Sequence, residues 1–165
     1  MREHRRRILL TLLGVPGLLL AQSRSTDERI TALTDLRETA ALITRHKAPL
    51  LILFSMPGCP FCLEVRRNYL APRVAEQARE PNPTLLLRET DITSTEMIVE
   101  LSGSKVTEAE FASRFNVRAV PVVALFDQSF KLLVEPLVGL DRSGFYEAYL
   151  SAAIEGAGRR LKQNA

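Results

Sequence analysis

The sequence predicts an α/β protein with a mixed central sheet, helices on both faces of that sheet, and an added N-terminal helix. Three observations support this class. The apolar run at 49–54, PLLILF, stops at a proline and glycine turn, as is typical of a buried strand. Apolar residues after Pro60 follow helical spacing, and a second apolar run at 84–88 completes a strand-helix-strand unit with parallel strands. Two later apolar runs, joined by only three residues, predict an antiparallel pair.

We expect two helices and two strands in the N-terminal half. Residues 26–46 place apolar side chains at helical spacing, and Thr26 or Asp27 can cap the start of that helix. The strand at 49–54 follows it. The next helix runs from Pro60 to about residue 80, and Pro72 should kink or divide it. Residues 84–88, TLLLR, form the second strand.

The C-terminal half should hold a short helix, two strands and a closing helix. Segment 97–101 either pairs with 105–106 as a small hairpin or forms a loop. Thr107 and Glu110 have the spacing of a capping box, which opens a helix to about residue 115. Strands are expected at 121–126 and 130–134, and Pro136 would fit only an edge strand. The last helix covers 142–154, with a frayed tail of glycines and basic residues after it.

Length and composition indicate one globular domain preceded by a secretory signal. The 165 residues are 46% hydrophobic and 25% charged, as in ordinary folded proteins. Arginines at positions 2, 5, 6 and 7 precede a 13-residue apolar run, and Ala21-Gln22-Ser23 has the small residues of a cleavage site. A membrane-spanning helix needs roughly 20 apolar residues. We therefore expect residues 1–23 to be a cleaved signal peptide and residues 24–165 to be the mature domain, with an uncleaved membrane anchor as the alternative.

The mature chain shows no charge imbalance. Without residues 1–23 it has as many acidic as basic residues, so the basic charge of the whole chain comes from the signal. Nothing therefore indicates binding of nucleic acid.

Both cysteines lie directly after the first predicted strand, in Cys59-Pro60-Phe61-Cys62. On the first turn of a helix, residues three apart share one face and lie within the range of a disulfide. Cys59 would occupy the N-cap position, with Pro60 at the first helical position. Its sulfur then faces unpaired amide groups, which favour the thiolate. Cys62, one turn deeper, should be the more shielded thiol.

This asymmetry predicts disulfide exchange, in which Cys59 attacks a substrate disulfide and Cys62 resolves the mixed disulfide. A purely structural bridge is the first alternative, although a disulfide that closes so small a loop adds little stability. A metal site is the second alternative. Zinc needs four ligands, and besides the cysteines the mature chain offers only His46 and carboxylates, so copper held by the two thiols is the less implausible form.

Taken together, these residues resemble the thioredoxin family. The likeness extends over about residues 48–155 and includes the strand LLILF, the cysteine motif at a helix start, Val120-Pro121 before the third strand and a later Val138-Gly139. With its signal and added helix, the chain looks most similar to exported thioredoxin-like proteins of bacteria, including those that accompany periplasmic sulfur oxidation. The resemblance implies the thioredoxin fold and a periplasmic location.

The resemblance also implies the other residues of the site. Pro121 should follow a cis peptide bond and pack against the disulfide, and the backbone of Val120 should contact an extended substrate segment. Ordinary packing at strand ends is the alternative explanation for these residues. The substrate-binding residues would be Gly58, Pro60, Phe61, Thr90, Ala119, Val120, Pro121, Val138 and Gly139.

Several positions depart from the family pattern. Leu53 stands six residues before Cys59, where thioredoxins carry a buried aspartate that helps to move the proton of the second cysteine. Deprotonation of Cys62 would then need water or another group, such as Glu64. Gly58 replaces a common aromatic residue, and the pair between the cysteines is Pro-Phe rather than Gly-Pro. These departures argue against efficient general disulfide reduction.

The leading hypothesis is an exported thiol:disulfide oxidoreductase, with Cys59 as nucleophile and Cys62 as resolving thiol. It would act on protein or small-molecule thiols and disulfides, together with a redox partner that the sequence does not identify. It would need no bound cofactor. The alternative is a periplasmic carrier or chaperone on the same scaffold, which holds copper or a partner without turnover. The membrane would be involved only through an uncleaved signal.

Overall fold

The computed structural model describes residues 29–141 and 143–164, and the predicted signal at 1–23 lies outside them. A four-stranded sheet forms the centre, in the order β2 (Leu86–Asp91), β1 (Leu50–Ser55), β5 (Val122–Phe126) and β6 (Leu137–Val138). Strand β1 is parallel to β2 and antiparallel to β5, which is antiparallel to β6, so the predicted mixed sheet is confirmed. All six residues of β1 are buried, because this strand lies inside a sheet that is covered on both faces.

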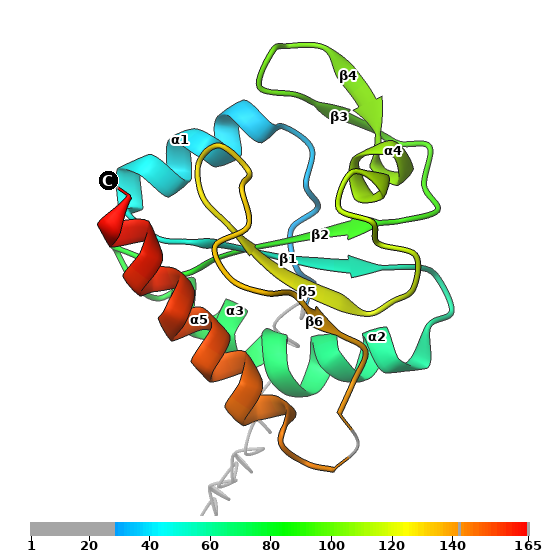
Figure 1. Cartoon of the computed structure of the whole chain (residues 1–165), viewed down its shortest axis with the longest axis vertical. Coiled ribbons are helices and arrows are strands. Elements are labelled where there is room, and N and C mark those ends of the chain that lie inside the picture. The colour runs from blue at the N-terminus through cyan, green and yellow to red at the C-terminus, as the bar shows by residue number, and fades with distance from the viewer. Residues whose placement is uncertain (1–28, 142, 165) are drawn as a thin grey trace, which may run out of the picture.

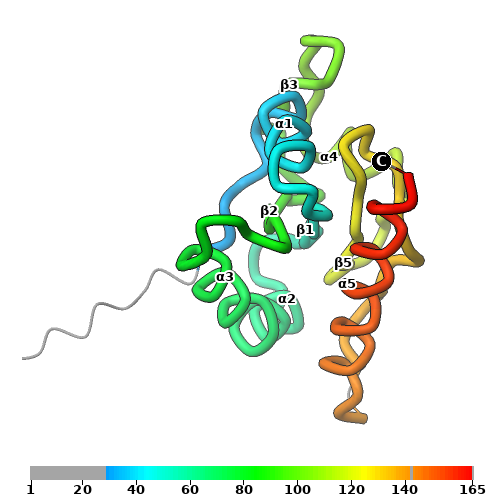
Figure 2. Tube along the Cα trace, turned by 90° about the vertical axis from the view of Figure 1, so that its left-hand side faces the viewer, coloured from blue at the N-terminus to red at the C-terminus, as the bar shows by residue number. Residues whose placement is uncertain are grey.

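Helices cover the two faces of the sheet. Helices α1 (Leu36–His46) and α4 (Glu108–Ser113) lie on one side (Figure 1). The other side carries α2 (Pro60–Glu64), the π-helical turn η1 (Val65–Leu70), α3 (Ala71–Gln77) and α5 (Tyr146–Gln163). In the view of Figure 2, α1 and β3 lie towards the top, whereas α2 and α3 lie towards the bottom with the start of α5. Among the described residues, no helix combines the length and the apolar character needed to cross a membrane.

The predicted N-terminal helix is wrong in its first part. Helix α1 begins only at Leu36, capped by the Asp35 side chain, which accepts hydrogen bonds from the Arg37 and Glu38 amides. The caps considered from the sequence, Thr26 and Asp27, lie outside the described residues. Residues 31–33 pair instead with Glu89 on the outer edge of β2, where Leu33 N–H donates to the Glu89 carbonyl at 2.8 Å, and Asp35 forms a bridge with Val99. This pairing satisfies the backbone groups of Glu89, which a helix would have left open.

The helix that follows the cysteines is divided as predicted. It consists of α2, η1 and α3 in unbroken succession, and Pro72 lies in the first turn of α3. Pro72 has no amide hydrogen for the helical ladder, and the wider π turn ends at Leu70, where α3 takes over.

The predicted second strand is displaced, and the uncertain segment after it is a hairpin. Strand β2 covers Leu86–Asp91 rather than 84–88, because its polar end continues beside β1 as far as Ser55. Strands β3 (Met97–Val99) and β4 (Lys105–Thr107) pair antiparallel. The capping box of α4 is confirmed, with both reciprocal bonds between Thr107 and Glu110 present.

The strand expected at 130–134 is wrong. Residues 130–134 form one bridge, Phe126 to Leu132, instead of a strand. The Asp127 carboxylate accepts from the amides of Ser129 and Lys131 and curls the chain into a tight turn. The strand that pairs with β5 on the side away from β1 is β6, which begins just after Pro136 at the sheet edge.

The tail is helical rather than frayed. Helix α5 continues through both glycines to Gln163, and Ala157 and Leu161 are buried in the core. At Gly156 a Cβ atom would lie 3.4 Å from the Val134 side chain, so the helix packs closely there. Burial of this last stretch offsets the low helix propensity of glycine.

Candidate active site

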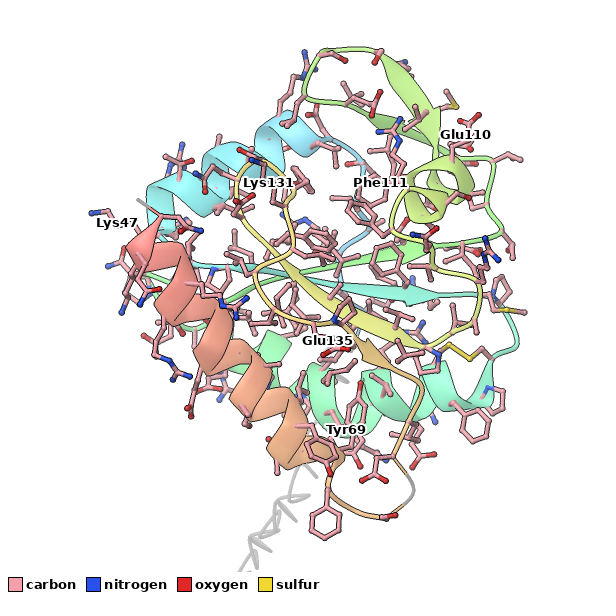
Figure 3. All side chains as sticks on the ribbon, in the orientation of Figure 1. Lys47, Tyr69, Glu110, Phe111, Lys131 and Glu135 are labelled. Atoms are coloured by element: carbon pink, nitrogen blue, oxygen red, sulfur yellow. A yellow bond between two sulfur atoms is a disulfide. The ribbon has the colours of Figure 1, made fainter. Side chains whose placement is uncertain are left out.

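Cys59 and Cys62 form a disulfide at the start of α2, directly after the turn that ends β1 (Figure 3). Their Cα atoms lie 5.3 Å apart, which is within the usual range for a disulfide. Gly58 allows the turn because its φ is +74°, in the left-handed region that other residues rarely adopt.

The two sulfurs have different surroundings. Cys59 is the N-cap residue of α2, and its Sγ accepts a hydrogen bond from the Cys62 backbone N–H at 3.0 Å. Pro60 follows at the first helical position, where no amide hydrogen is needed. Cys59 is half-buried, whereas Cys62 is only 1% exposed. The predicted difference in shielding is therefore present.

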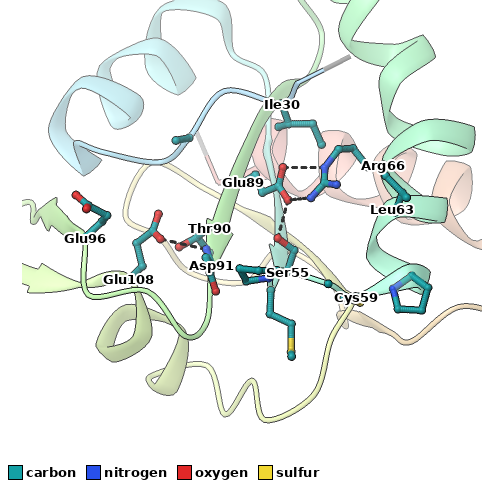
Figure 4. Close-up of a pocket in the computed structure, with 15 residues that line it drawn as sticks. Ile30, Ser55, Cys59, Leu63, Arg66, Glu89, Thr90, Asp91, Glu96 and Glu108 are labelled. Carbon is teal, nitrogen blue, oxygen red and sulfur yellow. Dashed lines mark hydrogen bonds and ion pairs between the residues drawn. The ribbon is translucent and has the colours of Figure 1, made fainter. Parts of the chain in front are cut away.

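An open groove with a volume of about 740 Å³ begins at Cys59 (Figure 4). Three of the residues predicted to bind substrate, Gly58, Pro60 and Thr90, line it. It continues along the end of β2 to Asp91 and Glu108.

The other predicted substrate-binding residues lie outside this groove. Ala119 and Val138 line a second hollow of about 240 Å³, and Phe61 lines a third of about 440 Å³. The Val120–Pro121 peptide bond is cis, and the Pro121 carbonyl accepts from the Gly139 amide at 2.8 Å. The structure thus divides the predicted set among several surfaces, and the role of each residue in substrate binding stays a prediction.

A polar network on the groove wall was missed by the sequence reasoning. The Glu89 carboxylate on β2 accepts a hydrogen bond from the Ser55 hydroxyl at 2.6 Å and from Arg66 Nε at 3.1 Å. A second guanidinium nitrogen of Arg66 contacts the same carboxylate. The network ties η1 to the two neighbouring strands (Figure 4). A sequence signal that could have indicated this network is the position of Arg66, one helical turn after Cys62.

Leu53 supplies no polar group beneath the cysteines. It is fully buried in β1, and its register partner on β2 is Glu89. The carboxylate opposite Leu53 on the neighbouring strand is therefore that of Glu89, which is already bound to Arg66 and Ser55. Glu64, the other group considered from the sequence, is exposed on α2.

At the far end of the groove lies a carboxyl group with an altered titration. Glu108 is only 8% exposed, and this burial raises its pKa above the ordinary value. Its Oε2 accepts a hydrogen bond from the Asp91 amide at 3.3 Å, while the negative charges of Asp91 and Glu96 raise the pKa further. The hydroxyl of Thr90, close to Glu108 in Figure 4, is buried and has no hydrogen-bond partner.

Apolar side chains flank the disulfide along the chain. Met56, Phe61 and Leu63 are each at least 40% exposed, and their closeness along the chain makes the surroundings of the disulfide apolar. Within the described part of the chain, no group of three or more His, Cys, Asp and Glu side chains is arranged to hold a metal ion. The site thus combines an accessible sulfur, a shielded sulfur and an apolar rim.

Comparison with known proteins identifies the family. A family model described as a thioredoxin-like domain matches residues 36–136. No curated protein sequence matches the chain. Among solved structures, a thioredoxin-fold protein from Helicobacter pylori is 18% identical with a TM-score of 0.51, over 71% of this chain and 79% of that one. Oxidised mitochondrial thioredoxin 3 from Saccharomyces cerevisiae is 20% identical with a TM-score of 0.48, over 76% and 93%.

At these identities, the solved structures support the fold alone. The family match covers more than half of the chain and includes both cysteines and the cis proline. The chain belongs to the family of thioredoxin-like domains and has the thioredoxin fold.

Proposed function

We propose that the protein is an exported thiol:disulfide oxidoreductase that exchanges disulfides with protein or small thiol substrates. The observation that carries this proposal is the asymmetric cysteine pair. Cys59 is accessible at a helix N-cap and accepts an N–H bond on its sulfur, whereas Cys62 is buried one turn deeper and already bonded to it. Membership of the thioredoxin-like family supports the same chemistry.

The reaction begins from the dithiol form. The Cys62 amide, which donates to the Cys59 sulfur at the start of α2, favours the thiolate of Cys59. This thiolate attacks one sulfur of a substrate disulfide, forms a mixed disulfide and expels the other substrate sulfur as a thiolate. Cys62 loses its proton to solvent and attacks the Cys59 sulfur, which releases the second substrate thiolate. The protein is left as the Cys59–Cys62 disulfide, and two electrons have passed to the substrate.

The same steps in reverse would oxidise a substrate dithiol. The direction depends on the reduction potential of the pair. A value near the −270 mV of thioredoxin would indicate a reductase, and one near the −120 mV of the strong oxidant DsbA would indicate an oxidase.

Export and a periplasmic location are part of the proposal. They are supported by the arginines and the apolar run of residues 1–23, by the small residues at 21–23 and by the resemblance to exported bacterial proteins, including those that accompany sulfur oxidation. Intact mass of the protein recovered from the periplasm should correspond to a chain that starts at Arg24. Protein that keeps residues 1–23 would contradict cleavage.

The exchange chemistry is tested with two serine variants and a dye-quenched disulfide peptide, using dithiothreitol as the electron donor. Cys59→Ser should abolish turnover, because the attacking sulfur is lost. Cys62→Ser should accumulate a mixed disulfide with the peptide, visible as a mass adduct on Cys59. Wild-type turnover rates in both variants would refute the assignment. Stoichiometric copper after purification under reducing conditions, without exchange activity, would favour a carrier.

A further inference from the structure

We propose that the groove beside Cys59 binds a positively charged group of the substrate, an arginine or lysine side chain close to the disulfide that is exchanged. The inference rests on the proposed function, because it assigns the substrate class of the same site. The groove joins the Cys59 end of α2 to the start of α4 along the end of β2 (Figure 4). A substrate sulfur at Cys59 and a side chain a few residues away can therefore occupy it together.

The lining of the groove carries a net negative charge. Asp91, Glu96 and Glu108 all line it. Among the described residues of the lining, the only cation is Arg66, and its guanidinium already binds Glu89. That ion pair is neutral as a whole, which leaves three carboxylates to set the potential of the groove.

Glu108 shows how these carboxylates affect one another. It is buried, and the nearby negative charges of Asp91 and Glu96 disfavour its ionised form, which a compensating positive charge would stabilise. A cation that entered this end of the groove would supply that charge, in a partly desolvated place where opposite charges attract more strongly than in water.

A second and independent observation comes from Thr90. Its side chain is only 1% exposed, its hydroxyl has no hydrogen-bond partner, and the residue lines the groove between Cys59 and Glu108. Buried polar groups in folded proteins are nearly always paired. The N–H groups of a guanidinium or ammonium ion would provide the missing partner for its oxygen.

The spread of the carboxylates favours an organic cation over a metal ion. In the part of the chain that the structure describes, no three acidic, histidine or cysteine side chains meet closely enough to bind one metal ion. A guanidinium group has five donors in a planar fork, so it can contact separated acceptors that a single metal ion cannot reach. Three unneutralised carboxylates would also disfavour an acidic substrate segment.

The test compares two disulfide peptides that differ only at the residue after the cysteine, which is arginine in one and its neutral isostere citrulline in the other. For the wild type we expect kcat/KM to be about tenfold higher with arginine. The double variant Asp91→Asn/Glu108→Gln should bring the ratio close to one. Glu155→Gln is the matched control, because it removes a charge from an exposed residue of α5 outside the groove and should keep the ratio.

Equal kcat/KM for both peptides in the wild type, or an unchanged preference in the double variant, would overturn the proposal. Because the ratio compares two peptides on one protein sample, partial unfolding of a variant does not change it. If neither peptide is turned over, the oxidoreductase function itself has failed. Binding is then measured by fluorescence anisotropy on the oxidised protein, with labelled peptides that carry serine for cysteine. Equal affinity for the two peptides would overturn the cation site separately.

Discussion

The Glu89 network makes a quantitative prediction about how the helix that carries the cysteines is held on the sheet. Glu89→Gln keeps the shape of the side chain but replaces a carboxylate oxygen by an amide nitrogen. Both oxygens of the Glu89 carboxylate accept from the Arg66 guanidinium, so the new nitrogen faces an N–H donor whichever oxygen it replaces. At least one Arg66 contact is therefore lost, and the remaining amide oxygen carries no charge.

The size of the effect follows from burial. The side chains of Arg66 and Glu89 are 25% and 17% exposed, so the pair is mostly shielded but water can still reach it. Hydrogen bonds to charged groups contribute about 1.5–3 kcal/mol, which places the expected loss near 2 kcal/mol. For a chain of this size, that lowers Tm by about 4–8 °C. Ser55→Ala removes only the 2.6 Å hydroxyl bond and should cost about 1 kcal/mol.

The assay is urea unfolding of the oxidised protein, followed by circular dichroism, with thermal melts as a second measurement. Glu155→Gln is the control, since Glu155 and its partner Arg159 are 72% and 69% exposed and 3.7 Å apart. Such a pair contributes about 0–1 kcal/mol. If Glu89→Gln is as stable as this control, the network does not anchor η1 and the reasoning fails.

Two further predictions concern the core. Leu161→Ala should destabilise the protein by about 2–4 kcal/mol, because Leu161 is only 6% exposed. Leu132 is 43% exposed, so Leu132→Ala should cost under about 0.5 kcal/mol. Similar urea midpoints for the two variants would contradict the packing of the last turn of α5. Burial raises the pKa of Tyr146 to about 12, whereas in the unfolded chain the group titrates near 10. The free energy of unfolding is therefore unaffected by this group up to about pH 10 and falls by about 2–3 kcal/mol as the pH rises to 12. Tyr146→Phe should remove this loss, and it should be at least as stable as the wild type at pH 8 because the hydroxyl has no partner. Urea midpoints of the variant and the wild type that fall in parallel from pH 8 to 11.5 would contradict this prediction.

The cysteine site was predictable because its geometry is local. An N-cap, a proline at the first helical position and a second cysteine three residues on are all set by one helical turn. The capping box at Thr107 and Glu110 was predictable for the same reason. Local spacing decides such features whatever surrounds them.

The failures come from long-range contacts. Apolar residues at 30, 33 and 36 fit a helix, yet the first two lie in a segment whose backbone pairs with β2, more than 50 residues later. Leu161 follows two glycines that favour fraying, but burial against the core holds it in the helix. The groove wall depends on Glu89 and Arg66, 23 residues apart, whose pairing requires the sheet to exist first.

Leu53 on β1 and Glu89 on β2 lie opposite each other in the sheet, and together they explain how this chain differs from the thioredoxin pattern. A carboxylate on β1 would lie beneath the cysteines as a free acceptor for a proton. Here the carboxylate stands one strand away and is bound by Ser55 and Arg66, so it ties η1 to the sheet. If the proposed exchange takes place, Cys62 has to lose its proton to water, and we expect resolution of the mixed disulfide to be the slow step. A slow second step would lengthen the life of the mixed disulfide, and a substrate held that long would benefit from the charge contacts proposed for the groove at Glu108.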